Sequence, residues 1–262
     1  MSPDEQVDQR IATGEMVAAQ FKRFCRPLGI SSSTGVEIER NYLELLDLLT
    51  RHLDEQPYFL GGRPCMGDFS IHGMIYAHLI RDARTGFVTK SRAPLVSNWC
   101  ERMRGYAKEH PLLDRYVVDE NRQLVKANDI DLDFLSNDAI APTLLPILKR
   151  VISDFVEPIL IPATEQLDRY ARQNPAGGLL PKPLMGKEPI SVRIGATKTT
   201  RMCNPFDIYR LQDCHRIIAE NPLLADFVEL IDPNGAIAQC RVDGFKLARI
   251  DNKLHLVPTS DL

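Results

Sequence analysis

Motifs for metal, redox and nucleophile chemistry are missing from this sequence. Its six cysteines lie far apart and form no Cys-x-x-Cys pair, which argues against zinc and against a redox dithiol. No Gly-x-Ser-x-Gly motif marks a nucleophile elbow. No apolar run approaches the roughly 20 residues that a membrane-spanning helix needs. The acidic segment 1–16 has no apolar centre, so we expect no secretory signal.

Excess charge of either sign is also missing. The 262 residues carry a formal net charge of -3 and no dense basic cluster, so neither nucleic acid nor a membrane is an expected partner. Apolar residues make up 44% and charged residues 26%, as in soluble globular proteins. The length allows one large domain or two small ones. We expect a soluble cytoplasmic protein with free thiols.

The first half of the chain has the apolar spacing of helices. This spacing is cleanest between Ile38 and Leu53, and it predicts two long helices joined as an antiparallel hairpin. A third helix is apolar on nearly every face and is expected to be buried at the centre. Residues 81–94 are predicted as a loop, and a fourth helix opens at Pro94. The predicted helices are 4–28, 35–56, 66–80 and 94–109, with no strand among them.

The second half has a different pattern. Helical spacing continues from Thr143 to Gln173, but Pro158 and Pro162 must kink or split that helix. Alternating residues on both sides of Gly195 predict a short β-hairpin. Two Asn-Pro pairs open further helices. The expected elements are helical segments in 143–173, after Asn204 and after Asn221, a hairpin across 190–202, and a strand or two after Gly235.

The segment from Gly62 to Gly67 matches the first six positions of a phosphate-binding P-loop. The next two positions should be Lys and Ser or Thr, but they are Asp68 and Phe69. A carboxylate there would repel a phosphate, and no predicted strand precedes the loop. A nucleotide site is therefore rejected.

Asp129, Asp131 and Asp133 match the first three ligand positions of an EF-hand calcium loop. The sixth position requires Gly and is Phe134, and the twelfth requires Glu and is Ile140. A solvated acidic linker is therefore the better interpretation.

Two histidines lie near groups that metal and catalytic sites use. Asp68 and His72 share a helix face, but His78 points away, so a third metal ligand is missing. His215 follows Cys214, but neighbouring residues on a helix point about 100° apart. A core histidine is the favoured interpretation of His72, and no metal site or catalytic residue is predicted.

Asp68 is best explained as part of a helix cap. If Cys65 is the N-cap, Asp68 is the third helical residue, and its carboxylate accepts from the Cys65 backbone N–H at the positive end of the helix. This capping box and the residues before it resemble the C-terminal helical domain of the cytosolic glutathione S-transferases. The matching residues are Pro57, Tyr58, Phe59, Leu60, Gly62, Pro64, Asp68 and Phe69.

Two positions depart from the family pattern. The capping Ser or Thr is Cys65, whose thiol is a weak acceptor. The usual Ala is Gly67, which lowers helix propensity by up to about 1 kcal/mol. The segment 92–103 resembles the next helix of the family. The resemblance covers about residues 10–110, and the rest is similar only in general texture to larger bacterial transferase-like proteins.

The resemblance implies a mainly α fold with two parts. A glutathione S-transferase C-terminal-like helical bundle occupies residues 1–118, and an extension with further helices and a small β element occupies 119–262. Transferases of this family carry an N-terminal thioredoxin-like domain that binds glutathione, and no such pattern precedes the first helix here. In the family this helix borders the hydrophobic substrate site, which implies substrate-binding roles for Met16, Gln20 and Phe24.

The resemblance therefore implies a protein that keeps the hydrophobic-ligand half and lacks a recognisable glutathione site. Its expected partner is a small apolar ligand or a protein. One alternative is an active glutathione-dependent transferase whose thioredoxin-like domain is truncated or supplied by another chain, with glutathione as its cofactor. The other is a dimerising interaction scaffold, because the long helical hairpin often forms the dimer interface in the family.

Overall fold

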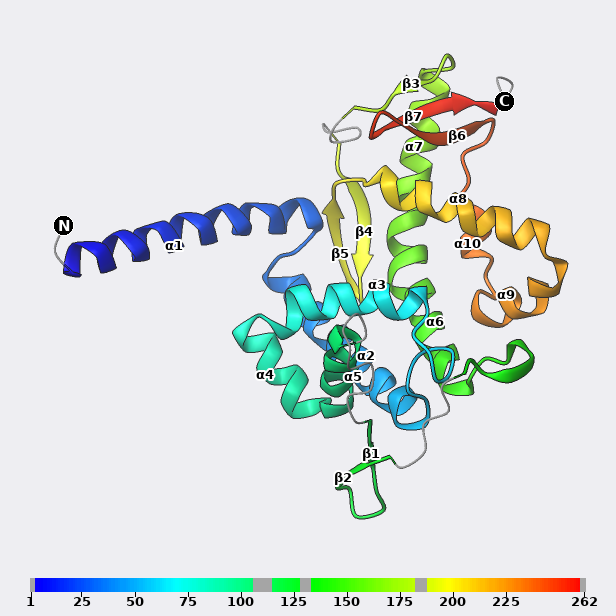
Figure 1. Cartoon of the computed structure of the whole chain (residues 1–262). Coiled ribbons are helices and arrows are strands. Elements are labelled where there is room, and N and C mark those ends of the chain that lie inside the picture. The colour runs from blue at the N-terminus through cyan, green and yellow to red at the C-terminus, as the bar shows by residue number, and fades with distance from the viewer. Residues whose placement is uncertain (1–2, 106–114, 128–132, 182–187, 260–262) are drawn as a thin grey trace. The chain divides into compact units, whose positions relative to one another are not determined.

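The computed structural model describes residues 3–105, 115–127, 133–181 and 188–259. The chain is mainly helical, with small antiparallel β elements (Figure 1). It divides into two compact units: unit 1 contains Met1–Glu39 and Val151–Leu262, and unit 2 contains Arg40–Arg150. These units do not follow the predicted division at residue 118, because unit 1 joins segments from both ends of the chain. No described helix is long and apolar enough to cross a membrane.

Unit 2 is a set of helices packed around Trp99. After the C-terminal part of α2 (Ser32–Glu55) come α3 (Met66–Met74), its π-helical continuation (Ile75–Ile80), α4 (Ala83–Arg92) and α5 (Pro94–Gly105). The strands β1 (Tyr116–Val118) and β2 (Leu124–Lys126), short 3-10 turns (Ser136–Asp138 and Pro142–Leu144) and α6 (Leu145–Val151) complete it. Its buried apolar core includes Leu46, Leu49, Leu53, Tyr58, Phe59, Ile75, Leu95, Val96, Trp99, Cys100, Met103, Leu144 and Ile147.

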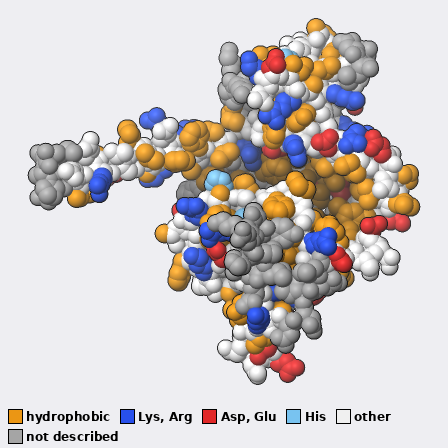
Figure 2. Space-filling model, viewed as in Figure 1, with side chains coloured by type: hydrophobic (Ala, Val, Ile, Leu, Met, Phe, Trp, Pro, Cys, Tyr) orange, Lys and Arg blue, Asp and Glu red, His pale blue; other side chains and the backbone are white. Residues whose placement is uncertain are grey.

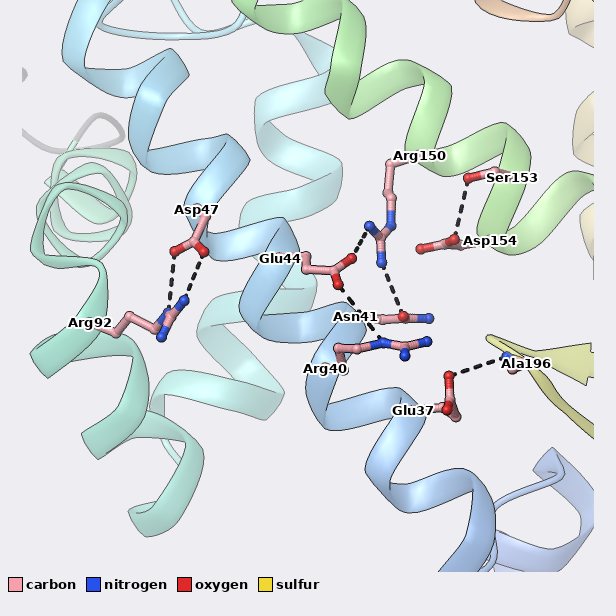
Figure 3. A network of polar contacts seen from close by, with 10 residues as sticks. All are labelled: Glu37, Arg40, Asn41, Glu44, Asp47, Arg92, Arg150, Ser153, Asp154 and Ala196. Atoms are coloured by element: carbon pink, nitrogen blue, oxygen red, sulfur yellow. Dashed lines mark hydrogen bonds and ion pairs between the residues drawn. The ribbon is translucent and has the colours of Figure 1, made fainter.

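Ion pairs tie α2 to the helices that pack on it in unit 2 (Figure 3). Arg92 of α4 holds the Asp47 carboxylate with both ends of its guanidinium, at 3.2 and 2.8 Å. Arg150 of α6 donates to Glu44 and, at 3.0 Å, to Asn41 Oδ1. Because the Arg92 and Asp47 side chains are about half exposed (48% and 46%), solvent screens this pair and its contribution to stability is small.

The helix α4 corrects the prediction of a loop at residues 81–94. Asp82 is its N-cap, and Oδ1 accepts from the backbone N–H groups of Arg84 and Thr85 at 3.0 and 3.3 Å. Gly86 lets α4 start close to the preceding helix, since an added Cβ would lie 2.3 Å from the Ile80 carbonyl oxygen. The helix buries only Gly86 and Thr89. It therefore lacks the regular spacing of buried apolar residues by which a helix is predicted from sequence.

The prediction that α3 is buried on nearly every face is wrong. Asp68 and, in the π-helical continuation, Ile75 and Ile80 are buried. Met66, Phe69 and Met74 of α3 are instead 76%, 46% and 63% exposed. One side of α3 therefore packs on the core of unit 2, and its other side is an uncovered apolar surface. The β1–β2 hairpin is a further difference, because no strand was predicted at these residues.

Unit 1 combines helices with two small sheets. The helices are α1 (Pro3–Cys25), a 3-10 turn (Arg26–Leu28), a π-helical segment (Ile152–Leu160), α7 (Ile161–Gln173), α8 (Pro205–Glu220), a second 3-10 turn (Pro222–Leu224), α9 (Ala225–Ile231) and α10 (Ala236–Gln239). The strands are β3 (Gly178–Leu179), β4 (Ile190–Ile194), β5 (Thr197–Arg201), β6 (Phe245–Ile250) and β7 (Lys253–Pro258). β4 pairs with β5, and β3, β7 and β6 form an antiparallel sheet in that order.

Several local predictions in unit 1 are confirmed. β4 and β5 form a hairpin whose Ile194 and Thr197 face each other across Gly195 and Ala196. Asn204 caps α8, and its Oδ1 accepts from the Phe206 backbone N–H at 3.2 Å. The predicted interruption at Pro158 is the π-helical segment between α6 and α7.

The 3-10 turn that follows α1 is anchored to β5 and to the residue after it. The Met202 backbone N–H donates to the Pro27 carbonyl at 2.7 Å, and Thr199 Oγ1 donates to the Gly29 carbonyl at 3.3 Å. The N-terminal part of α2 also meets the hairpin, where Glu37 Oε2 accepts from Ala196 N–H at 3.2 Å (Figure 3). The described side chains of α1 from Gln6 to Phe24 are all exposed. The predicted burial of the apolar residues of α1 is therefore not provided within unit 1.

Candidate functional site

A buried carboxylate lies at the start of α3. Cys65 is the N-cap, and its backbone N–H donates to Asp68 Oδ2 at 2.9 Å, while the Cys65 thiol faces the Asp68 backbone N–H. The Phe59 backbone N–H donates to both carboxylate oxygens, at 3.2 and 3.3 Å. Trp99 Nε1 donates to Oδ1 at 3.1 Å. Donors from three segments thus converge on one side chain, which is 0% exposed.

The surroundings of Asp68 act on its pKa in opposite directions. Burial raises the pKa of Asp68, and the hydrogen bonds from Cys65, Phe59 and Trp99 offset part of this rise because they favour the charged form. The sequence predicted only the contact with Cys65. The other two donors lie 9 and 31 residues away from Asp68, so no local pattern indicates them.

A buried histidine supports the same turn. His52 Nε2 lies 3.2 Å from the Tyr58 carbonyl oxygen, so this nitrogen carries the proton and donates it. Its Nδ1 lies 3.0 Å from Thr143 Oγ1, and this hydroxyl donates to Glu55 Oε2 at 3.3 Å. The ring packs edge-on against Phe59 at 5.7 Å, and Phe59 stacks on Trp99 at 5.9 Å. Burial lowers the pKa of His52, so the imidazole is neutral and serves as a packing and hydrogen-bonding group.

Two buried arginines fix the chain that leads into this turn. Arg102 Nη2 donates to the Pro57 carbonyl at 2.6 Å, and the guanidinium lies 5.3 Å above the Tyr58 ring. Arg115 Nη2 donates to the carbonyls of Leu53 and Asp54 at 3.3 and 2.6 Å. Arg102 and Arg115 are only 3% and 8% exposed. These groups are closed off from solvent and hold backbone, which makes the cluster a structural one.

Gly61, in the same turn, lies in close contact with the backbone of residues 133–135. Gly61 has φ 114°, and an added Cβ would lie 2.8 Å from the Leu135 backbone nitrogen. Gly62 N–H donates to the Asp133 carbonyl at 2.7 Å, and Leu135 N–H donates to the Leu60 carbonyl at 2.9 Å. The Asp133 carboxylate pairs with Arg63 at 2.9 Å.

The acidic segment 129–133 thus ends in a backbone pairing and an ion pair. Residues 129–132 themselves lie outside the described residues. No group of three or more potential metal ligands occurs among the residues that the structure describes.

The two histidine pairs from the sequence do not form sites. Asp68 directs its oxygens to Phe59, Cys65 and Trp99, while the His72 ring stacks on Tyr76 at 5.4 Å and meets Trp99 edge-on at 5.9 Å. Burial lowers the pKa of His72. In unit 1, His215 Nε2 donates to the Ile237 carbonyl at 2.7 Å, and the neighbouring Cys214 is exposed.

The structure does not bring the proposed substrate-binding residues into a described pocket. Met16 and Phe24 are 65% and 57% exposed on α1, and Gln20 is exposed between them. A pocket of about 340 Å³ on α1 is lined instead by Gln6, Gln9, Arg10 and Thr13.

A second pocket, of about 360 Å³, lies between the π-helical segment and the β4–β5 hairpin of unit 1. Glu157 lines it together with Arg193 and Lys198, so its mixed charges select no single class of ligand.

Comparison with known proteins gives no relative for this chain. No family model matches it, and no curated protein and no solved structure matches it. The function is therefore inferred from the residues and the geometry alone.

Proposed function

We propose that this chain is a glutathione S-transferase-like helical protein that binds a protein partner and does not conjugate glutathione by itself. The observation that carries the proposal is the uncovered apolar side of α3, formed by Met66, Phe69 and Met74 at 76%, 46% and 63% exposure. Soluble proteins seldom leave clustered apolar side chains exposed unless another surface covers them.

The same helix carries the motif that resembles the transferase family. The turn at residues 57–62 is held by Arg102, and the cap at Asp68 is fully formed. Both features support a rigid α3, and a rigid surface loses less conformational entropy when it binds a partner. The resemblance names the class of partner, because the helical half of a complete transferase packs against a thioredoxin-like domain. A small apolar ligand at Met16, Gln20 and Phe24 has less support, since neither described pocket includes them.

The test uses a purified thioredoxin-like domain of a cytosolic glutathione S-transferase as the probe. We expect it to bind the full chain in calorimetry, and we expect Met66→Glu/Met74→Glu to weaken binding at least about tenfold, which corresponds to about 1.4 kcal/mol. The matched control is Phe87→Glu on α4, because Phe87 is similarly exposed (73%) but lies on another helix. The control should bind like the parent. Absence of binding by the parent chain, or equal binding by all three proteins, would refute the proposal.

An activity assay distinguishes the proposed function from the alternative of a transferase whose thioredoxin-like domain is supplied by another chain. The chain alone should not conjugate glutathione to an aromatic electrophile and should not be retained on glutathione agarose. Turnover that appears only when the thioredoxin-like domain is added would favour the two-chain enzyme. Turnover by the chain alone would contradict the proposed function.

A further inference from the structure

The pocket between the π-helical segment and the β4–β5 hairpin lies entirely within unit 1. None of the residues that line it belongs to α1, whose exposed hydrophobic side chains are visible in Figure 2. None belongs to unit 2 either, so an occupant of this pocket is independent of the partner proposed for α3. The lining residues are Ser153, Glu157, Pro158, Pro162, Ser191, Val192, Arg193 and Lys198.

The charged groups of this pocket differ in whether they already have partners. Glu157 Oε1 accepts from Asn234 Nδ2 at 2.9 Å. The side chains of Arg193 and Lys198 are exposed, and neither has a hydrogen-bond or ion-pair partner in the part of the chain that the structure describes. The kinds of charge present therefore select no ligand by themselves, but the two cations leave a positive charge that no carboxylate matches.

The two cations face each other directly across the strands of the hairpin, with Arg193 on β4 and Lys198 on β5. The Cβ atoms of such a pair lie about 4.5–5.5 Å apart, and like charges at this distance destabilise a sheet. Glu37, at the tip of the hairpin, accepts instead from the Ala196 backbone N–H at 3.2 Å (Figure 3). An anion bound between the two cations would remove their repulsion.

A hydroxyl group lies on the same face of the hairpin. Ser191 precedes Arg193 by two residues on β4, and alternate residues of a strand point to the same face. Both side chains are exposed, whereas Val192 between them is buried. The guanidinium, the ammonium and this hydroxyl thus supply hydrogen-bond donors to one anionic group.

The rest of the pocket suits an uncharged, hydroxylated body. Pro158 and Pro162 line it from the π-helical segment and the first turn of α7, and their rings form an apolar surface against which the CH groups of a sugar ring can pack. The Glu157 carboxylate accepts hydrogen bonds from hydroxyl groups and repels a second anionic group. The volume of about 360 Å³ is near the lower end for small-molecule pockets, so one ring fits it better than a dinucleotide.

We infer that this pocket binds a sugar phosphate. The phosphate lies between Arg193 and Lys198 and accepts from the Ser191 hydroxyl, and the sugar packs on the two prolines with its hydroxyl groups toward Glu157. A phosphate monoester carries a charge of about -1.5 to -2 at pH 7, which matches two cations, whereas a carboxylate carries a single charge.

Calorimetry of the full chain with glucose 1-phosphate, glucose and inorganic phosphate tests the site. We expect one-to-one binding of glucose 1-phosphate, weaker binding of inorganic phosphate and none of glucose. Arg193→Gln and Lys198→Gln should each weaken the binding of glucose 1-phosphate at least about tenfold. The matched control is Lys246→Gln on β6, which removes one exposed cation that does not line the pocket and should bind like the parent.

Three results would overturn the inference. The parent chain could fail to bind glucose 1-phosphate, or all three variants could lose the same affinity, which would indicate attraction by net charge alone. Inorganic phosphate could also bind as tightly as glucose 1-phosphate, which would show that the prolines and Glu157 recognise no sugar.

A matched pair of ligands tests the role of Glu157. Glucuronic acid 1-phosphate has the ring of glucose 1-phosphate but carries a carboxylate in place of the CH₂OH group. The parent chain should bind it several-fold more weakly, because Glu157 repels the second anionic group. Glu157→Gln should reduce this difference, and an unchanged difference would contradict the proposed orientation of the sugar.

A charge reversal separates loss of binding from loss of folding. Arg193→Glu places opposite charges across the hairpin, so the variant should melt at or above the parent temperature. Glucose 1-phosphate should raise the melting temperature of the parent chain and leave that of Arg193→Glu unchanged. An equal rise in both proteins would refute the site.

Discussion

Replacing Asp68 by Ala should destabilise unit 2 by about 3 kcal/mol. The loss of the cap on α3 costs about 1 kcal/mol. The Phe59 backbone N–H and Trp99 Nε1 also lose their acceptor, and each buried unsatisfied donor costs about 1–2 kcal/mol. Part of this loss is offset, because the variant no longer buries a carboxylate whose pKa is raised by desolvation. A cap alone would cost only about 1–2 kcal/mol, so the magnitude tests the three-donor arrangement.

Replacing Asp68 by Asn should cost nearly as much as replacing it by Ala. Both carboxylate oxygens accept hydrogen bonds, and an amide must turn its NH₂ group toward Cys65 N–H, Phe59 N–H or Trp99 Nε1. A donor facing a donor gains nothing and repels it. Cys65→Ser should act in the opposite direction and stabilise by about 0.5 kcal/mol, because a hydroxyl accepts from the Asp68 N–H better than a thiol does.

The assay is urea unfolding followed by tryptophan fluorescence. Trp99 is the only tryptophan of the sequence and touches Asp68, so its emission reports on this site. The matched control is Asp47→Ala, which breaks the half-exposed pair with Arg92 and should destabilise far less than Asp68→Ala. Equal unfolding midpoints for the parent and Asp68→Ala would refute the capping account. A small loss confined to Asp68→Ala, with Asn tolerated, would refute the three-donor arrangement.

Three further predictions concern backbone, pH and thiols. In the same urea assay, Gly61→Ala should destabilise by at least about 2 kcal/mol, because the φ of 114° and the Leu135 nitrogen, 2.8 Å from an added Cβ, exclude a side chain. Gly73→Ala should instead stabilise α3 by up to about 1 kcal/mol, because no atom lies within 4 Å of a Cβ added there. Burial lowers the pKa of His52, His72 and His215 in the folded chain below 6.5. The unfolded chain therefore binds more protons than the folded chain at lower pH. Stability that is present above about pH 6.5 should be lost on acidification. His52→Gln should flatten this dependence, and a parent chain that gains stability between pH 6.5 and about pH 5.5 would contradict it. Burial raises the pKa of Cys100 and Cys203 to about 12 and of Cys240 to about 11, so a thiol reagent should label these three only after unfolding. Cys214→Ser should remove a fast-reacting exposed thiol. Rapid labelling of the three buried thiols in the native protein would disprove their burial.

Features that depend on neighbouring residues were predictable from the sequence. The capping relation between Cys65 and Asp68, the Asn204 cap of α8 and the turn at Gly195 each join groups within a few residues of one another. Their geometry follows from local hydrogen bonding and backbone preference, so residue type and spacing are enough to indicate them. The mainly helical character was predictable for the same reason.

Features that depend on distant segments were decided only by the tertiary structure. Trp99 meets Asp68 across 31 residues, and no periodicity relates the two positions. The apolar composition of α3 predicted burial. Hydrophobicity indicates that a side chain is more stable when buried, but it does not indicate which surface buries it.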